Sequence, residues 1–346
     1  TLTVAVGSVS TSAPLKVANG VSTVTVTGLQ ASIAGFARIS GDFGLQLRPG
    51  ATSALDELHV VSNNAAASLS VGTAVKAGVR DATVALVIRG DQKLALQATG
   101  AADLSLGDGF ASVSVNAVGV AFNNTGEDMD RLLSVAVGQM VVAAPLKVLN
   151  GQSGVVLSGL KATIGGFVTI AGDFGVQKTP AIGTAAEELV VVARNASARL
   201  TAGEVIRVGV SDATLALIIR GDQKLALQAT GAADLSLGNG FAEVSVTTVG
   251  VIFNTTGQDV ARTAAVRVGA IEVSAPLQVA AGQSAVILSG LKATVGGFVS
   301  ISGNFGVQKV TGSTPEKDEL IVVANSAEAR VQAGVALRAG VRDARL

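Results

Sequence analysis

The residues of this chain that could do chemistry are few, and the most conspicuous is a repeated tripeptide. Arg89-Gly90-Asp91 and Arg220-Gly221-Asp222 match the tripeptide bound by integrin-type receptors. Both copies stand between two apolar segments, where a two-residue hairpin loop with glycine at a positive φ is also expected. We therefore predict a turn at both places and no adhesion site.

His59 is the single histidine, and valine and isoleucine stand at the corresponding positions, Val190 and Ile321. A catalytic group encoded in a repeat would not tolerate that replacement. With no second histidine and no cysteine, neither a zinc site nor a nucleophilic triad can be assembled. We expect His59 to be a strand residue and the chain not to be an enzyme, with no catalytic residue and no cofactor-binding residue.

Acidic residues recur in two patterns that could supply oxygen ligands to calcium. The recurring positions are Asp56-Glu57, Glu187-Glu188, Asp318-Glu319, and Asp42, Asp173 and Asn304. Neighbouring strand residues point to opposite faces, so each pair offers at most one ligand per face. Charge that protects a sheet edge is the alternative explanation. We predict no metal site, and calcium is the one cofactor left open.

Three Asn-x-Ser/Thr sequences match the glycosylation pattern, at Asn123, Asn195 and Asn254. Asn123 and Asn254 each follow a phenylalanine at the end of an apolar segment, and they precede Asn-Thr-Gly and Thr-Thr-Gly, respectively. An asparagine that starts a turn explains them equally well, and we favour that interpretation.

Composition decides which elements must hold these residues. The chain has 346 residues, 49% hydrophobic, 3% aromatic and 14% charged, with 42 glycines. Lys and Arg number 25 and Asp and Glu 25, so the basic patch that nucleic acid requires is not expected. No run of 18 apolar residues and no signal peptide are found, so no membrane span is expected. This composition favours an all-β protein.

An internal repeat organises the whole chain. Pro14, Pro145 and Pro276 stand in equivalent hexapeptides, each 131 residues from the next. We therefore divide the chain into copy 1 (1–131), copy 2 (132–262) and a partial copy 3 (263–346). Gly-Phe pairs recur at alternating spacings of 74 and 57 residues, which predicts two related halves in each copy. We expect the chain to be a window from a longer array.

Local structure is predicted from the alternation of apolar and polar residues. From Leu29 to Leu47 the odd positions are apolar, which predicts one long half-buried strand or two strands joined at glycines. Asn19-Gly20 and Asn150-Gly151 predict type I′ hairpin turns. At most a single helical turn is expected at 127–133 and at 259–264. The fold class is thus all-β, an elongated tandem-repeat array with continuous β-solenoid-like stacking, or alternatively a string of β-sandwich beads.

Several motifs make the chain resemble the tandem-repeat regions of giant bacterial surface and secreted proteins, the adhesin-like or RTX-adhesin-like class. They are the Gly-Phe-x-x-(Ile/Val)-(Ser/Ala) elements, Gly172–Gly175, Val191–Ala198 and the Phe-Asn-x-Thr-Gly strand ends. The resemblance implies an elongated, non-catalytic protein, extracellular or at the cell surface. We expect a structural segment of a fibre or filament that associates with itself. The alternative is an adhesin stalk or module that binds glycans or a host surface.

Overall fold

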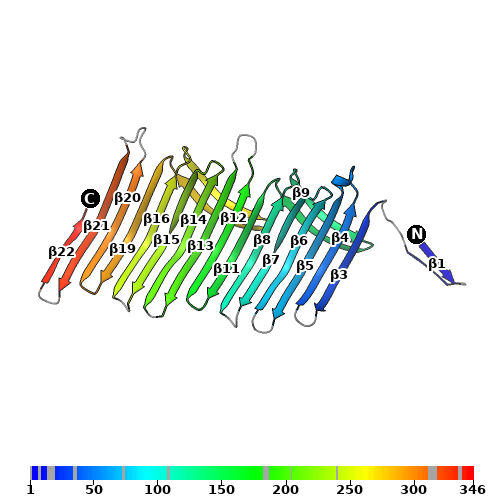
Figure 1. Cartoon of the computed structure of the whole chain (residues 1–346), viewed down its shortest axis with the longest axis horizontal. Coiled ribbons are helices and arrows are strands. Elements are labelled where there is room, and N and C mark those ends of the chain that lie inside the picture. Colours follow the sequence, from blue (N-terminus) through cyan, green and yellow to red (C-terminus); the bar gives the residue numbers. More distant parts are fainter. Residues whose placement is uncertain are drawn as a thin grey trace.

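The protein is all-β in a computed structural model, which describes residues 2–6, 9–13, 20–33, 37–71, 75–106, 110–181, 187–203, 205–238, 241–310, 318–333 and 337–346. Sixteen strands form one antiparallel sheet, and three further pairs of strands form separate two-stranded hairpins. The sheet is long, and its strands follow one another side by side in chain order (Figure 1). The all-β, elongated tandem array expected from the sequence is confirmed.

The strands of the sheet recur with the period of the sequence. Copy 1 contributes β3 (Ser22–Ile33), β4 (Ala37–Arg48), β5 (Glu57–Val71), β6 (Val75–Arg89), β7 (Leu94–Leu106) and β8 (Ala111–Asn123). Copy 2 contributes β11 (Ser153–Ile164), β12 (Val168–Thr179), β13 (Glu188–Ala202), β14 (Ile206–Arg220), β15 (Leu225–Leu237) and β16 (Ala242–Asn254). Copy 3 contributes β19 (Gln283–Val295), β20 (Val299–Val310), β21 (Glu319–Ala333) and β22 (Leu337–Ala344).

The sheet does not break where one copy meets the next. β8 pairs antiparallel with β11, and β16 pairs in the same way with β19. Phe122 lies opposite Ser153 at the first of these joins, and Phe253 lies opposite Ser284 at the second. Neighbouring copies therefore share one hydrogen-bonded ladder.

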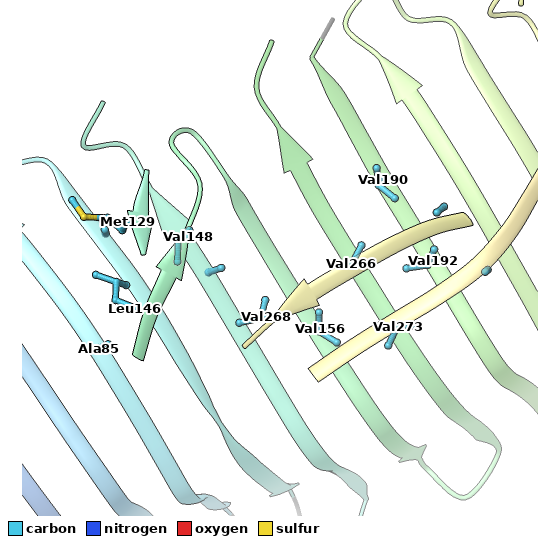
Figure 2. Close-up of a cluster of buried hydrophobic side chains, with 14 of the residues drawn as sticks. Ala85, Met129, Leu146, Val148, Val156, Val190, Val192, Val266, Val268 and Val273 are labelled. Atoms are coloured by element: carbon cyan, nitrogen blue, oxygen red, sulfur yellow. The ribbon is translucent and has the colours of Figure 1, made fainter. Parts of the chain in front are cut away.

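Each group of sheet strands is preceded in the chain by a two-stranded hairpin outside the sheet. The hairpins are β1 (Leu2–Val6) with β2 (Val9–Ala13), β9 (Met129–Val137) with β10 (Met140–Val148), and β17 (Val260–Val268) with β18 (Ile271–Val279). The hairpin β9–β10 packs over β3 to β8, and β17–β18 packs mainly over β11 to β16. We call the covered side of the sheet the hairpin face and the other side the open face. Figure 2 shows β17–β18 crossing the strands beneath it.

The core lies between each hairpin and the sheet. Alternate residues of the hairpin strands point toward the sheet, and three of them are at most 1% exposed: Leu133, Val135 and Leu146. They meet a row of mostly small residues on the hairpin face, paired strand by strand: Thr25, Gly44, Val61, Ala85, Gln97 and Ala121. A β-carbon at Gly44 would lie 2.7 Å from Cβ of Val135, so glycine is what lets the hairpin approach this closely.

Several local expectations are corrected. The segments 127–133 and 259–264 begin β9 and β17 and contain no helical turn. In the Asn150-Gly151 turn only Gly151 has a positive φ (71°), which is a type II pattern, and the strands that it joins do not pair. One expectation left two alternatives open, and the second holds: the described residues from Leu29 to Leu47 lie in two strands, β3 and β4. Asn19 and the pair Gly35-Phe36 lie outside the described residues.

Candidate functional site: the clamps and the open face

The two Arg-Gly-Asp segments form turns, as predicted, but by a different geometry. The N–H of Gln92 donates to the carbonyl of Arg89 (2.9 Å) and the N–H of Arg89 donates to Lys93 (2.8 Å), which closes a three-residue loop. Gln92, not Gly90, has the positive φ (65°). Glycine is needed because a β-carbon at Gly90 would collide with the carbonyl oxygen of Ser53. The Arg89 side chain is only 10% exposed and that of Arg220 is 27% exposed, so neither guanidinium group is fully presented to solvent.

His59, which is itself buried, belongs to a partly buried cluster that ties the hairpin β9–β10 to the sheet. Its Nε2 lies 2.7 Å from Oε2 of Glu57, and Arg131 on β9 donates to Oε1 of the same carboxylate at 2.8 Å. Burial raises the pKa of Glu57, but the hydrogen bonds from Arg131 and His59 outweigh it and hold the pKa below its usual value. Burial lowers the pKa of His59, against the opposing effect of Glu57.

Copy 2 repeats this arrangement without a histidine, and we call each pairing of a hairpin arginine with a glutamate of the sheet a clamp. Arg262 on β17 donates to Oε2 of Glu188 at 2.5 Å, and Arg220 lies 3.7 Å from the other carboxylate oxygen. Val190 takes the place of His59 and is 9% exposed. The second residue of each of these acidic pairs therefore binds a hairpin arginine, which the sequence analysis did not foresee because the partners are 74 residues apart.

The recurring Asp42, Asp173 and Asn304 stabilise backbone bulges. Each accepts a hydrogen bond through Oδ1 from the N–H of a glycine at positive φ, namely Gly28, Gly159 and Gly290, at 2.7 to 2.8 Å. Asparagine replaces aspartate in copy 3 because the bond needs an oxygen acceptor and no charge. In the described part of the chain no cluster of three or more His, Cys, Asp or Glu side chains could hold a metal ion.

Two of the three glycosylation-type asparagines are structural. Asn123 is 1% exposed, and its Nδ2 donates to the carbonyls of Glu127 and Val148. Its Oδ1 accepts from the N–H and the hydroxyl of Thr125, which is the turn-starting role that the sequence predicted. Asn254 repeats the arrangement in copy 2. Asn195 lies exposed at a bulge of β13 with a φ of 49°.

An exposed apolar surface on the sheet was not identified from the sequence as a site. On the open face, apolar residues of successive strands lie opposite one another in two rows, which we call the apolar strip. The first row is Val24, Leu45, Val60, Leu86, Leu96 and Phe122. The second row is Val155, Val176, Val191, Leu217, Leu227 and Phe253.

The apolar strip is exposed to solvent within this chain. Val24 is 58% exposed, and Leu45 and Val176 are each 44% exposed. The signal for the strip was the alternation from Leu29 to Leu47, whose odd positions were expected to be half buried. Those positions whose side chains the structure describes do share one face, but it is the open one, and Ile39 and Leu47 are 41% and 44% exposed. Alternation identifies an apolar face but does not say whether anything covers it.

Charged residues border the strip in copy 2, where Lys178 on β12 pairs with Glu187 at 3.0 Å. The corresponding residue in copy 1 is Leu47, which is apolar and 44% exposed.

Fold and surface together define the class of this protein: an all-β tandem-repeat array whose single sheet has hairpins on one face and an exposed apolar strip on the other. No family model, curated protein or solved structure matches the chain. No helix in the described ranges is long and apolar enough to cross a membrane.

Proposed function

We propose that the chain is a non-catalytic, structural repeat segment of an extracellular fibre or filament that associates with copies of itself. The observation that carries this proposal is the ladder that runs without a break from β8 to β11 and from β16 to β19. A sheet that continues from copy to copy gains length in one direction with every added repeat, which is what a shaft requires. The extracellular setting rests on the adhesin-like resemblance of the sequence.

The buried polar groups support a structural role. The carboxylates of Glu57 and Glu188 are each engaged by a hairpin arginine, and the Asn123 and Asn254 side chains bind backbone groups. Catalysis needs titratable groups that converge on a pocket open to substrate. The cluster of Glu57 with His59 and Arg131 lies beneath a hairpin, where His59 is 2% exposed.

The test is to vary the number of copies and measure length. Each complete copy adds six strands to the sheet, or about 29 Å at the usual spacing of paired strands. Proteins with one, two and three additional copies should grow by this increment in small-angle scattering and electron microscopy. Compact beads joined by flexible connections, or turnover of a polysaccharide panel by the purified protein, would refute the proposal. Tight glycan binding by isolated monomeric rods would favour an adhesin.

A further inference from the structure

We propose that the apolar strip packs against the apolar strip of a second copy of this chain, so that two sheets form a sandwich between molecules. This inference deepens the proposed function, on which it rests for the idea of self-association, by naming the surface and the partner. The first observation concerns β7 and β15, which have no bulge of their own, so that alternate side chains keep to one face along the whole strand.

β7 and β15 show how unequal the two faces are. Along β7, the open face receives Leu94, Leu96, Ala98, Ala102, Leu104 and Leu106. The opposite face receives Ala95 and Gln97 beneath the hairpin and then Asp103 and Ser105. Antiparallel sheets with this pattern keep the polar face in water and bury the apolar face. Here hairpins already cover the hairpin face in copies 1 and 2, and the open face has no cover within the described chain.

The exposed area is far larger than a compact monomer would have. The accessible surface is 20067 Å² for a chain of 34.2 kDa, against about 13,000 Å² expected for a compact protein of that mass. With the row that copy 3 adds, Val286, Val307 and Val322, and with the open-face residues on either side of the rows, the strip spans roughly six residues along the strands of the 16-stranded sheet, or about 20 Å by 70 Å. Pairing two strips would bury about 1,400 Å² on each molecule, which is in the range of permanent interfaces. Monomers rarely expose an apolar patch of that size.

The chemistry of the strip favours a second copy over a lipid surface. Membrane interfaces are enriched in tryptophan and tyrosine, and binding to anionic headgroups draws on lysine and arginine. The chain has no Trp and no Tyr, and its formal net charge is zero. Lys178, at the border of the strip, is paired with Glu187. Rows of Val, Leu and Phe instead suit face-to-face packing of two sheets, where inner side chains interdigitate.

A second copy also satisfies the geometry of the strip. Two identical faces related by a twofold axis meet as one self-complementary interface. The Val24 row of copy 1 recurs as the Val155 row of copy 2, so a partner displaced by one repeat meets the same side chains. If each molecule pairs with a partner displaced by one repeat, the assembly is open-ended and can grow into a filament. It needs no contact beyond the strip.

The experiment introduces charge into the strip and measures association. Leu45→Lys, Val155→Lys and Val176→Lys, combined in one protein, change side chains that are 41% to 44% exposed, so the fold should be retained. The matched control carries Leu132→Lys and Val141→Lys on the outer side of the hairpin β9–β10, where exposure is 67% and 57%. In sedimentation equilibrium the wild type and the control should associate, and the strip variant should be monomeric. Circular dichroism verifies that all three keep their β structure.

A second measurement keeps the test valid if the strip variant misfolds. The chain has no cysteine, so Val176→Cys introduces a unique thiol, and Leu132→Cys is its control. Bismaleimide should cross-link two Val176→Cys molecules efficiently and two Leu132→Cys molecules poorly. The inference would be overturned if the wild type stayed monomeric over a 100-fold range of concentration that reaches its solubility limit. Equal cross-linking at both sites would overturn it as well.

Two outcomes separate this inference from the proposed function. Rods that lengthen with copy number but remain monomeric would refute the pairing and leave the structural role intact. If the strips pair but the length of the protein does not grow with copy number, the pairing stands and the proposed structural role is refuted. Binding of a monomeric wild type to neutral lipid vesicles, lost in the strip variant, would assign the strip to a membrane and overturn pairing with a second copy.

Discussion

Copy 2 and copy 3 carry nearly the same strands, yet their hairpin faces differ in burial. Val156, Val190 and Val192 in copy 2 are 0%, 9% and 0% exposed. The corresponding Ile287, Ile321 and Val323 in copy 3 are 54%, 41% and 51% exposed. The hairpin β17–β18 lies over the first set, and no described hairpin lies over the second. Burial in this fold is therefore a property of the hairpin, since the strands alone leave these side chains in water.

The largest effect should come from a glycine under the hairpin. A β-carbon at Gly175 would lie 2.7 Å from Cβ of Val266, whereas at Gly306 it meets only a side-chain methyl of Val323 at 3.0 Å. We expect Gly175→Val to lower the free energy of opening of β17–β18 by about 3 kcal/mol through overpacking. Native-state hydrogen exchange of the hairpin amides measures this. Gly306→Val should leave those amides unchanged, and equal effects would show that hairpin contact is not the cause.

Truncation of one identical side chain in each copy gives the next largest difference. Val192→Ala removes two buried methyl groups at a site with 0% exposure, which should cost about 2 kcal/mol in the free energy of unfolding. Val323→Ala, at 51% exposure, should change it by less than about 0.5 kcal/mol. Denaturant titrations of the two variants check this. A similar loss at both positions would mean that copy 3 is covered in solution.

The buried histidine makes the clamp of copy 1 sensitive to pH, unlike that of copy 2. The folded-state pKa of His59 lies below its usual value of 6.5 because burial disfavours the imidazolium ion. The unfolded chain therefore binds the proton more readily, and stability falls as pH drops below about 6.5. The slope is at most about 1.4 kcal/mol per pH unit for one proton. His59→Val should remove this slope between pH 7 and 5.5 in thermal unfolding.

Glu57 sets a second, more acidic window. Its lowered pKa means that its contribution is present above the usual value of 4.5 and is lost as pH falls through the folded-state pKa. His59→Val should leave that acidic transition in place. If the variant keeps the whole slope between pH 7 and 5.5, His59 is not its source.

The smallest effect is expected from the clamp of copy 2. The Arg262 side chain is 46% exposed and that of Glu188 is 22% exposed, so solvent screens the ion pair. Arg262→Gln should cost about 0.5 kcal/mol, less at high salt. Glu319→Gln is the matched control, because Glu319 occupies the place of Glu188 in copy 3. Stability in low and high salt tests the pair, and a loss in the control as large as that in Arg262→Gln would contradict the hairpin clamp.

Sequence patterns predicted the elements better than the contacts between them. The alternation around Ile39 and Leu45 correctly gave strands, and Asn123 was correctly expected to start a turn. The Arg262–Glu188 bond was not predicted, because it joins residues 74 apart that only the folded hairpin brings together. The positive φ of Gln92 was missed since turn signals point to the glycine two residues earlier.

By itself, the sequence determined an all-β repeat of 131 residues with apolar residues on alternate strand positions. That period of two follows from backbone geometry, since successive side chains of any strand point to opposite faces. Only the tertiary structure decided which face is covered. Gly175 lies under Val266, a residue 91 positions away, while Val176, its neighbour in the chain, faces water at 44% exposure. Whether a face of the sheet is buried depends on the long-range packing of a hairpin against it, and the local alternation of apolar and polar residues does not predict that packing.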